Sequence, residues 1–237
     1  MKTGNNKKFS AGKEYRKSWD YIKESRNFIF SVILIFLFFS LIGFFIPAPE
    51  YIKEQVYNFL KEILEKTENL SAGEMITFIF FNNLQTSFFS FVFGVMFGIL
   101  PLITAAVNGY VLGFVAFMSV EANGIFSLLR LFPHGIFELP AVFLSLGLGL
   151  KLGLWLIIEP VKFYWKKNKA ISFLFVLFYL PTLIFALTGD YKFKIKMKAN
   201  FLNFQKNFRN SLMVFFLIIF PLLIIAAIVE GILMFTK

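Results

Sequence analysis

Long, predominantly apolar segments are the feature of this chain that most restricts its fold. Residues 75–100 form one such segment. As a helix rising 1.5 Å per residue it would be roughly 39 Å long, enough to cross a bilayer. The chain is 58% hydrophobic and only 16% charged, and a soluble domain of 237 residues could not cover its surface with so few charges. The sequence therefore predicts an all-α, polytopic transmembrane helical bundle.

Five segments are predicted to span the membrane, and a sixth is ambiguous. The predicted spans are residues 28–46, 75–100, 102–120, 133–158 and 211–235. Residues 171–188 are also apolar and just long enough to cross, but Pro181 lies in their middle and a run of lysines follows them. This segment is either a sixth span or a hairpin that bends at Pro181 and returns to the side it came from.

The distribution of charge predicts the orientation of the chain. Residues 1–27 carry eight basic residues ahead of the transmembrane domain at 28–237, and the positive-inside rule places them in the cytoplasm. Residues 50–70 have apolar positions at helical spacing and predict an amphipathic helix on the outer surface. Lys151 falls near the inner end of its predicted span, where we expect its ammonium group to snorkel to the headgroups. We expect a multi-pass protein of the cell membrane.

The excess of basic residues also indicates a partner. Lys and Arg number 24 against 14 Asp and Glu, a net charge of +10. Nucleic-acid binding would require this charge on a folded surface with recognisable motifs. Here the charge lies beside apolar segments, so we expect contact with anionic headgroups of the inner leaflet and none with nucleic acid.

Polar residues inside the apolar segments form the candidate site. They are Asn82, Asn83, His134, Glu138 and Glu230. With five spans, the rise per residue places all of them in the outer leaflet, and we expect one asparagine to approach Glu138 or His134. They form either a polar site that exchanges protons or binds a cation, or structural hydrogen bonds worth roughly 0.6–2 kcal/mol each. The sequence leaves both interpretations open.

Pairs of glycines four residues apart predict close helix packing. The pairs are Gly94 and Gly98, Gly109 and Gly113, and Gly149 and Gly153. Small residues at this spacing let two helix backbones touch. Because the pairs fall in three consecutive predicted spans, we expect those three helices to form one tightly packed centre.

The residue inventory argues against an enzyme. The chain has no cysteine and one histidine, which excludes disulfides, thiolate metal sites and two-histidine zinc sites. Its two aspartates, Asp20 and Asp190, lie outside the predicted spans, and no G-x-S-x-G motif is present. We therefore expect no enzymatic activity, no cofactor and no metal.

Several motifs in order carry a resemblance to a known family. They are Phe81-Asn82-Asn83, Asn108-Gly109-Tyr110-Val111-Leu112-Gly113, Pro133-His134-Gly135-Ile136-Phe137-Glu138-Leu139 and an apolar helix from Pro221 to Gly231. From Phe28 onward the chain resembles the stage II sporulation protein M family of integral membrane proteins. The resemblance implies a helical protein of about five spans.

In spore formers, the namesake of that family anchors a peptidoglycan-degrading complex in the membrane, although members also occur in organisms that make no spores. The resemblance thus implies a non-enzymatic membrane scaffold or anchor for envelope-associated partner proteins. The alternative is a component of a small-solute or ion transporter or channel, with the five polar residues lining its site. A scaffold would tolerate Glu138→Gln, whereas a transporter would lose activity while remaining folded.

Overall fold

A computed structural model describes residues 10–46, 48–165 and 191–235. Within these ranges the chain is all-helical, and five helices are long and apolar enough to cross a membrane, which confirms the predicted fold class. The helices are α1 (Ala11–Glu24), α2 (Arg26–Phe45), α3 (Glu50–Thr67), α4 (Ala72–Phe97), α5 (Leu100–Asn123), α6 (Leu128–Trp165), α9 (Tyr191–Val214) and α10 (Phe220–Phe235). A 3₁₀ turn, η1 (Ile125–Ser127), precedes α6, and a π-helical segment, η2 (Phe215–Ile219), joins α9 to α10.

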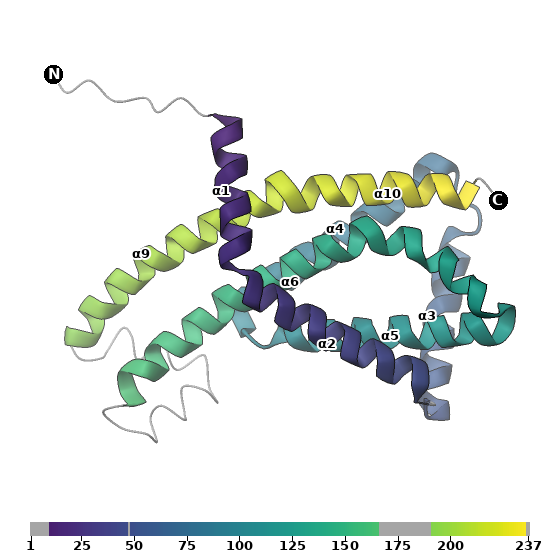
Figure 1. Cartoon of the computed structure of the whole chain (residues 1–237), viewed down its shortest axis with the longest axis horizontal. Coiled ribbons are helices and arrows are strands. Elements are labelled where there is room, and N and C mark those ends of the chain that lie inside the picture. The colour runs from purple at the N-terminus through teal and green to yellow at the C-terminus, as the bar shows by residue number, and fades with distance from the viewer. Residues whose placement is uncertain (1–9, 47, 166–190, 236–237) are drawn as a thin grey trace.

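The long helices run back and forth along one axis (Figure 1). α2 leads from the end of the bundle marked by α1 to the end marked by α3, α4 returns, α5 goes out again and α6 returns. α9 begins at the same end at which α6 finishes, and α10 ends near α3. The described helices therefore make five passes. The ambiguous segment 171–188 lies outside the described residues.

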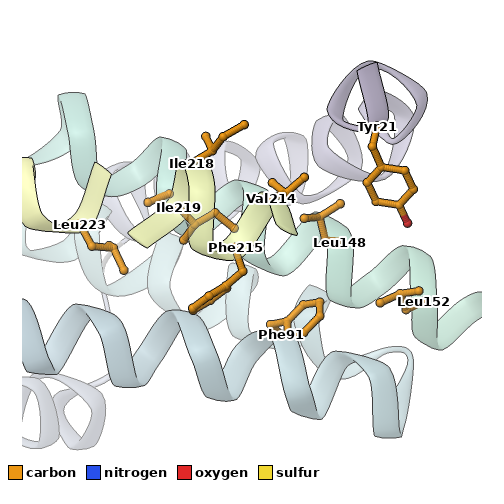
Figure 2. Close-up of a cluster of buried hydrophobic side chains, with 10 residues drawn as sticks. Tyr21, Phe91, Leu148, Leu152, Val214, Phe215, Ile218, Ile219 and Leu223 are labelled. Atoms are coloured by element: carbon orange, nitrogen blue, oxygen red, sulfur yellow. The ribbon is translucent and has the colours of Figure 1, made fainter. Parts of the chain in front are cut away.

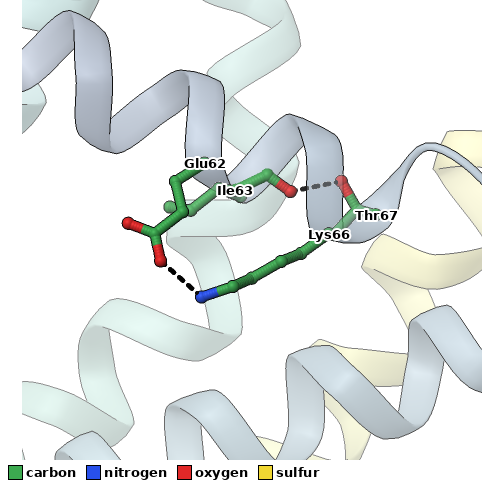
Figure 3. A network of polar contacts seen from close by, with 4 residues as sticks. All are labelled: Glu62, Ile63, Lys66 and Thr67. Atoms are coloured by element: carbon green, nitrogen blue, oxygen red, sulfur yellow. Dashed lines mark hydrogen bonds and ion pairs between the residues drawn. The ribbon is translucent and has the colours of Figure 1, made fainter.

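Two helices lie across the bundle axis: α3 at one end, and α1 where α2 begins, with α9 and the last part of α6 extending beyond it (Figure 1). α3 corresponds to the predicted amphipathic helix. On it Lys66 Nζ donates to Glu62 Oε1 at 2.6 Å and Thr67 Oγ1 donates to the Ile63 carbonyl at 2.9 Å (Figure 3), and the bond from Lys66 lowers the pKa of Glu62. α1 was not predicted, because its charged sequence read as a polar segment. Both helices have the orientation of interfacial helices.

Local sequence features explain where the helices begin and end. Several of these positions differ from the predicted boundaries. Ser71 and Glu74 form a capping box, with the Ser71 N–H donating to Glu74 Oε2 at 2.9 Å, so α4 starts at Ala72. Gly124, with a φ of 76°, ends α5. Since α6 already starts at Leu128, Pro133, the first residue of the predicted span 133–158, lies inside this helix.

Among the described residues, the largest buried cluster lies where α4, α6 and the α9–η2–α10 helix meet, with a contribution from α1. Figure 2 shows Phe91 of α4 facing Phe215 of η2, with Leu148 and Leu152 of α6 beside them and Tyr21 of α1 at the edge. The Phe91 and Phe215 ring centroids are 6.1 Å apart. This apolar packing fixes the faces of α4 and α6 toward each other.

The glycine pairs pack closely, but not as one three-helix centre. Gly94 of α4 lies against Gly149 of α6, where an added Cβ would be 2.8 Å from the Gly149 Cα atom. Gly153 lies against Gly98, with 2.5 Å between an added Cβ and the Gly98 Cα atom. α5 instead packs on α2: an added Cβ on Gly109 or Gly113 would overlap a backbone carbonyl of α2.

The expectation of a single centre is therefore wrong. Two glycine-mediated interfaces exist, α4–α6 and α2–α5. The partner of α5 is α2 because Ser40 and Gly43 give α2 a matching small face: a Cβ on Gly43 would overlap the Tyr110 carbonyl. The spacing of glycines shows which face of a helix carries small residues, but not which other helix packs against that face. Gly147 of α6, packed on Ile29 of α2, joins the two pairs.

Candidate functional site

The adjacent asparagines of α4 lie in different environments. Asn83 is 6% exposed, whereas Asn82 is exposed at the surface of the bundle. Neighbouring residues of a helix diverge by about 100°, so only one of them can face the interior. The structure selects Asn83 for the interior and places Asn82 on an outward face.

A buried polar stripe runs along α4 from Asn83. Ser87 and Ser90 follow at intervals of four and three residues, and all three side chains are buried. The hydroxyl of Ser145, on α6, donates to the Ser87 carbonyl. Among the described residues, Asn83 Nδ2 and Ser87 Oγ are buried without a hydrogen-bond partner. We call Asn83, Ser87, Ser90 and Ser145 the polar stripe. The prediction from sequence did not group these serines with Asn83, although their helical spacing from Asn83 was available there.

The contacts between α4 and α6 set the level of Glu138. The two helices run in the same direction, with Ser145 opposite Ser87 and Gly149 opposite Gly94. Counting back along both helices places Glu138 level with residues 80–83 of α4. Glu138 is half-buried and shares a helix face with the fully buried Ser145, seven residues on. It therefore lies beside the end of the polar stripe that is nearest α3.

Two other predicted residues lie near this level. Gly231 of α10 packs on Ile76 of α4, and the two helices run in opposite directions, so the half-buried Glu230 is level with about residue 77. The same count along α6 places the backbone of His134 level with residues 76–79, and its side chain lies outside the described part. Contact of Asn83 with Glu138 or His134 stays a prediction. No group of three His, Asp or Glu residues suited to a metal ion occurs in the described ranges.

A second polar cluster lies where α1 packs on α6. Lys151 Nζ of α6 is 3.9 Å from the centroid of the Tyr21 ring on α1 and donates to Ser25 Oγ at 2.9 Å. The Tyr21 hydroxyl accepts from Ser211 Oγ of α9 at 3.2 Å. Burial raises the pKa of Tyr21 to about 12, so the phenol is neutral at physiological pH.

This cluster corrects the expectation that Lys151 snorkels. α1 crosses the bundle where α2 begins, and the Lys151 ammonium lies over its Tyr21 ring instead of pointing freely away from the bundle. The half-buried ammonium is held by a cation–π contact and a hydrogen bond. Lys151 thereby ties α1 to α6. The sequence could not show this, because it depends on a helix that was not predicted.

A cavity of about 500 Å³ opens at the α3 end, between α3 and the ends of α2 and α5. Phe44, Phe117 and Tyr57 form part of its wall, and the carboxylates of Glu54 and Glu121 also line it. This acidic, aromatic surface lies at the opposite end of the bundle from the basic α1 helix.

Comparisons with known proteins agree with the membrane architecture. The family described as Stage II sporulation protein M matches residues 32–233, from α2 to α10. An uncharacterized protein of Methanocaldococcus jannaschii is 30% identical over 146 residues, which cover 60% of this chain and 63% of that relative. The chain thus spans less than two thirds of the relative's length. No solved structure matches. Since the family match covers all five membrane-crossing helices in whole or large part, this integral membrane protein belongs to the stage II sporulation protein M family.

Proposed function

We propose that the protein is a non-enzymatic scaffold of the cell membrane that anchors envelope-associated partner proteins, with its N-terminus in the cytoplasm. The observation that carries this proposal is the outward face of α4. Asn82 and Gln85, three residues apart, are both exposed there and form no hydrogen bond with any described residue. The cytoplasmic N-terminus is supported by the positive charge of residues 1–27.

The depth of these amides makes them unusual. The membrane-crossing part of α4 is Ala72–Val95, and Asn82 is ten residues from its start. At 1.5 Å per residue this is about 15 Å, well inside the hydrocarbon core. An amide without a partner in hydrocarbon costs roughly 2–7 kcal/mol, because lipid tails offer neither donor nor acceptor. A transmembrane helix of a partner protein can supply both.

The surface beside these amides suits such a helix. A groove of about 370 Å³ lies between α4 and the η2–α10 segment, and Gln85 is on its wall. The remaining wall is apolar and mostly aromatic: Phe81, Leu84, Phe88, Phe89, Phe215, Phe216 and Phe220. The π-helical segment η2 forms one side of this groove, and such segments recur at functional sites. Together the amides and the groove offer hydrogen bonds and side-chain pockets on one face.

The test is co-purification of partner proteins from membranes of the native host in mild detergent. The double variant Asn82→Leu/Gln85→Leu should lose a partner that the unaltered protein retains in stoichiometric amount, while its own melting temperature stays equal or rises. Thr77→Val is the matched control, since Thr77 is also exposed on α4 but its hydroxyl already donates to the Gly73 carbonyl at 2.8 Å. Retention of every partner by the double variant would contradict the proposal.

A second candidate function, a component of a small-solute or ion transporter or channel, is favoured by the polar stripe. Asn83 Nδ2 and Ser87 Oγ are buried without partners among the described residues, and Glu138 lies beside them. Unsatisfied polar groups in a membrane interior are costly and often line a pathway. Flux of protons and alkali cations into proteoliposomes separates the candidates. A transporter loses flux in Glu138→Gln while remaining folded, whereas a scaffold keeps its partners in this variant.

A further inference from the structure

A lateral groove of about 650 Å³ lies near the α1 end of the bundle, between α1, α2, α6 and the η2–α10 segment. Its wall includes Trp19 and Ile22 from α1 and Ile29 and Ile33 from α2. Pro140 of α6 and Pro221 of α10 also line it. Among the described residues, no charged side chain contributes to the wall. Because Ile29 and Ile33 are near the start of the membrane-crossing helix Arg26–Phe45, the groove lies within the hydrocarbon of the leaflet on the α1 side.

The mouth of this groove has the chemistry of the headgroup region. Trp19 and Tyr15 of α1 line it and are 48% and 53% exposed, and amphipathic rings of this kind settle at the membrane interface. Lys23 lies four residues after Trp19, on the same face of α1. Arg26 opens α2 three residues before Ile29 and seven before Ile33, so it shares the face that lines the groove.

Both cations are available at this mouth. Arg26 is exposed and forms no ion pair or hydrogen bond with the described residues. Among the described residues, Lys23 forms only a long ion pair, 3.9 Å, with the exposed Asp20. A planar guanidinium is well suited to bind phosphate oxygens in pairs, and an ammonium adds a point charge.

From this geometry we propose that the groove is a binding site for an anionic phospholipid of the leaflet on the α1 side. One acyl chain occupies the groove, and the phosphate lies against Arg26 and Lys23. The occupant is a lipid and not a partner helix, because the polar side chains among the described lining residues, Tyr15 and Trp19, lie at the mouth, whereas the outward face of α4 places two amides deep in the hydrocarbon. It is anionic because two cations without strong partners flank the mouth. The site is independent of the scaffold role.

The charge of the two residues sets the size of the expected preference. A basic residue near an anionic surface favours binding about fivefold. The unaltered protein should therefore bind an anionic lipid at least about fivefold more tightly than a zwitterionic lipid with the same chains.

Trp19 itself supplies the measurement. The chain has three tryptophans, and Trp155→Phe with Trp165→Phe leaves Trp19, beside the groove, as the single tryptophan. This protein is placed in bilayers that contain increasing fractions of phosphatidylglycerol or phosphatidylcholine with brominated acyl chains, and the bromine quenches a nearby indole. Half-maximal quenching is expected at a mole fraction of brominated phosphatidylglycerol at least about fivefold lower than that of brominated phosphatidylcholine.

Two charge variants test where the headgroup lies. Lys23→Gln/Arg26→Gln should bring the ratio of the two mole fractions close to one, with unchanged helicity because both residues are exposed. Lys53→Gln/Lys61→Gln on α3 removes the same charge from the other end of the bundle and should leave the ratio unchanged. Equal quenching by both lipids in the unaltered groove, a ratio unaffected by Lys23→Gln/Arg26→Gln, or no quenching by either lipid would each overturn the proposal.

Discussion

The α2–α5 and α4–α6 helix pairs both pack through glycines, but they differ in the polar side chains that they bury. Both bring backbones together through glycines, on Gly43, Gly109 and Gly113 in one pair and on Gly94 and Gly149 in the other. The α2–α5 interface buries no polar side-chain atom that lacks a hydrogen-bond partner among the described residues. The α4–α6 interface contains two such atoms, Asn83 Nδ2 and Ser87 Oγ.

This difference separates packing from function. Close helix contact in a membrane requires only small residues, as α2–α5 demonstrates. The amide and hydroxyl in α4–α6 add desolvation cost that the contact does not need. The α4–α6 pair is also the one that Lys151 ties to α1. We infer that α2–α5 is the structural half of the bundle and that α4–α6 is the half in which polar side chains were kept for a role.

The largest expected loss of stability comes from substituting the glycines at which the helices of each pair touch. Gly109→Leu and Gly94→Leu should each destabilise the protein by about 3 kcal/mol, the upper end for overpacking, because the obstructing atoms include backbone of α2 or α6. Each should exceed the effect of Leu112→Ala. Thermal unfolding in detergent, followed by circular dichroism, measures the change.

Gly73→Leu is the matched control for these variants, since an added Cβ there meets nothing within 4 Å. It should leave the melting temperature nearly unchanged. If Gly109→Leu were tolerated equally well, the α2–α5 pair would not be the rigid half of the bundle.

The next effect concerns the attachment of α1 to α6 and depends on pH. The pKa of Tyr21 is raised from 10.0 to about 12, chiefly by burial, so its contribution to stability is fully present below pH 10 and is lost as the pH rises toward 12. A shift of this size corresponds to roughly 2–3 kcal/mol. Tyr21→Phe should remove this part of the alkaline destabilisation while retaining the ring beneath Lys151.

Denaturant unfolding of the protein and of Tyr21→Phe between pH 8 and 12 measures this effect as a difference, which cancels the titration of the lysines. The exposed Tyr57, substituted by Phe, is the control and should leave the alkaline profile unchanged. Identical profiles for the protein and Tyr21→Phe would show that Tyr21 is not buried by α1 docking.

These features also show what the sequence could predict. Apolar length and the spacing of small residues are local properties, so the five membrane-crossing helices and the glycine faces could be read directly. Which helix meets Gly109, and whether Asn82 or Asn83 points inward, depends on the rotation of whole helices about their axes. That rotation is set by contacts distant in sequence, such as Phe91 with Phe215. The docking of α1 on Lys151 escaped prediction for the same reason.

A smaller effect is expected within the polar stripe. Ser145→Ala removes the hydrogen bond to the Ser87 carbonyl and should lower stability by about 1 kcal/mol, within the range measured for interhelical bonds in membranes. Ser31→Ala is the control, because Ser31 is exposed and donates only to the Asn27 carbonyl of its own helix. A loss equal to that of the control would mean that this bond contributes nothing to the α4–α6 contact.

The smallest expected effect is a gain in stability, and it tests most directly whether the α4–α6 pair keeps a polar side chain for function. Asn83→Leu replaces a buried amide whose Nδ2 lacks a partner among the described residues with an apolar side chain of similar size. The melting temperature should stay the same or rise by the equivalent of up to about 1 kcal/mol, since an unmet amide costs more than it contributes. Leu146→Asn, which places an amide at a fully buried apolar position of α6, is the reverse substitution and should destabilise. A gain in stability combined with lost partner binding or lost flux would show that Asn83 is retained for function. A marked loss of stability would instead make Asn83 a structural residue, and the α4–α6 pair would then resemble α2–α5.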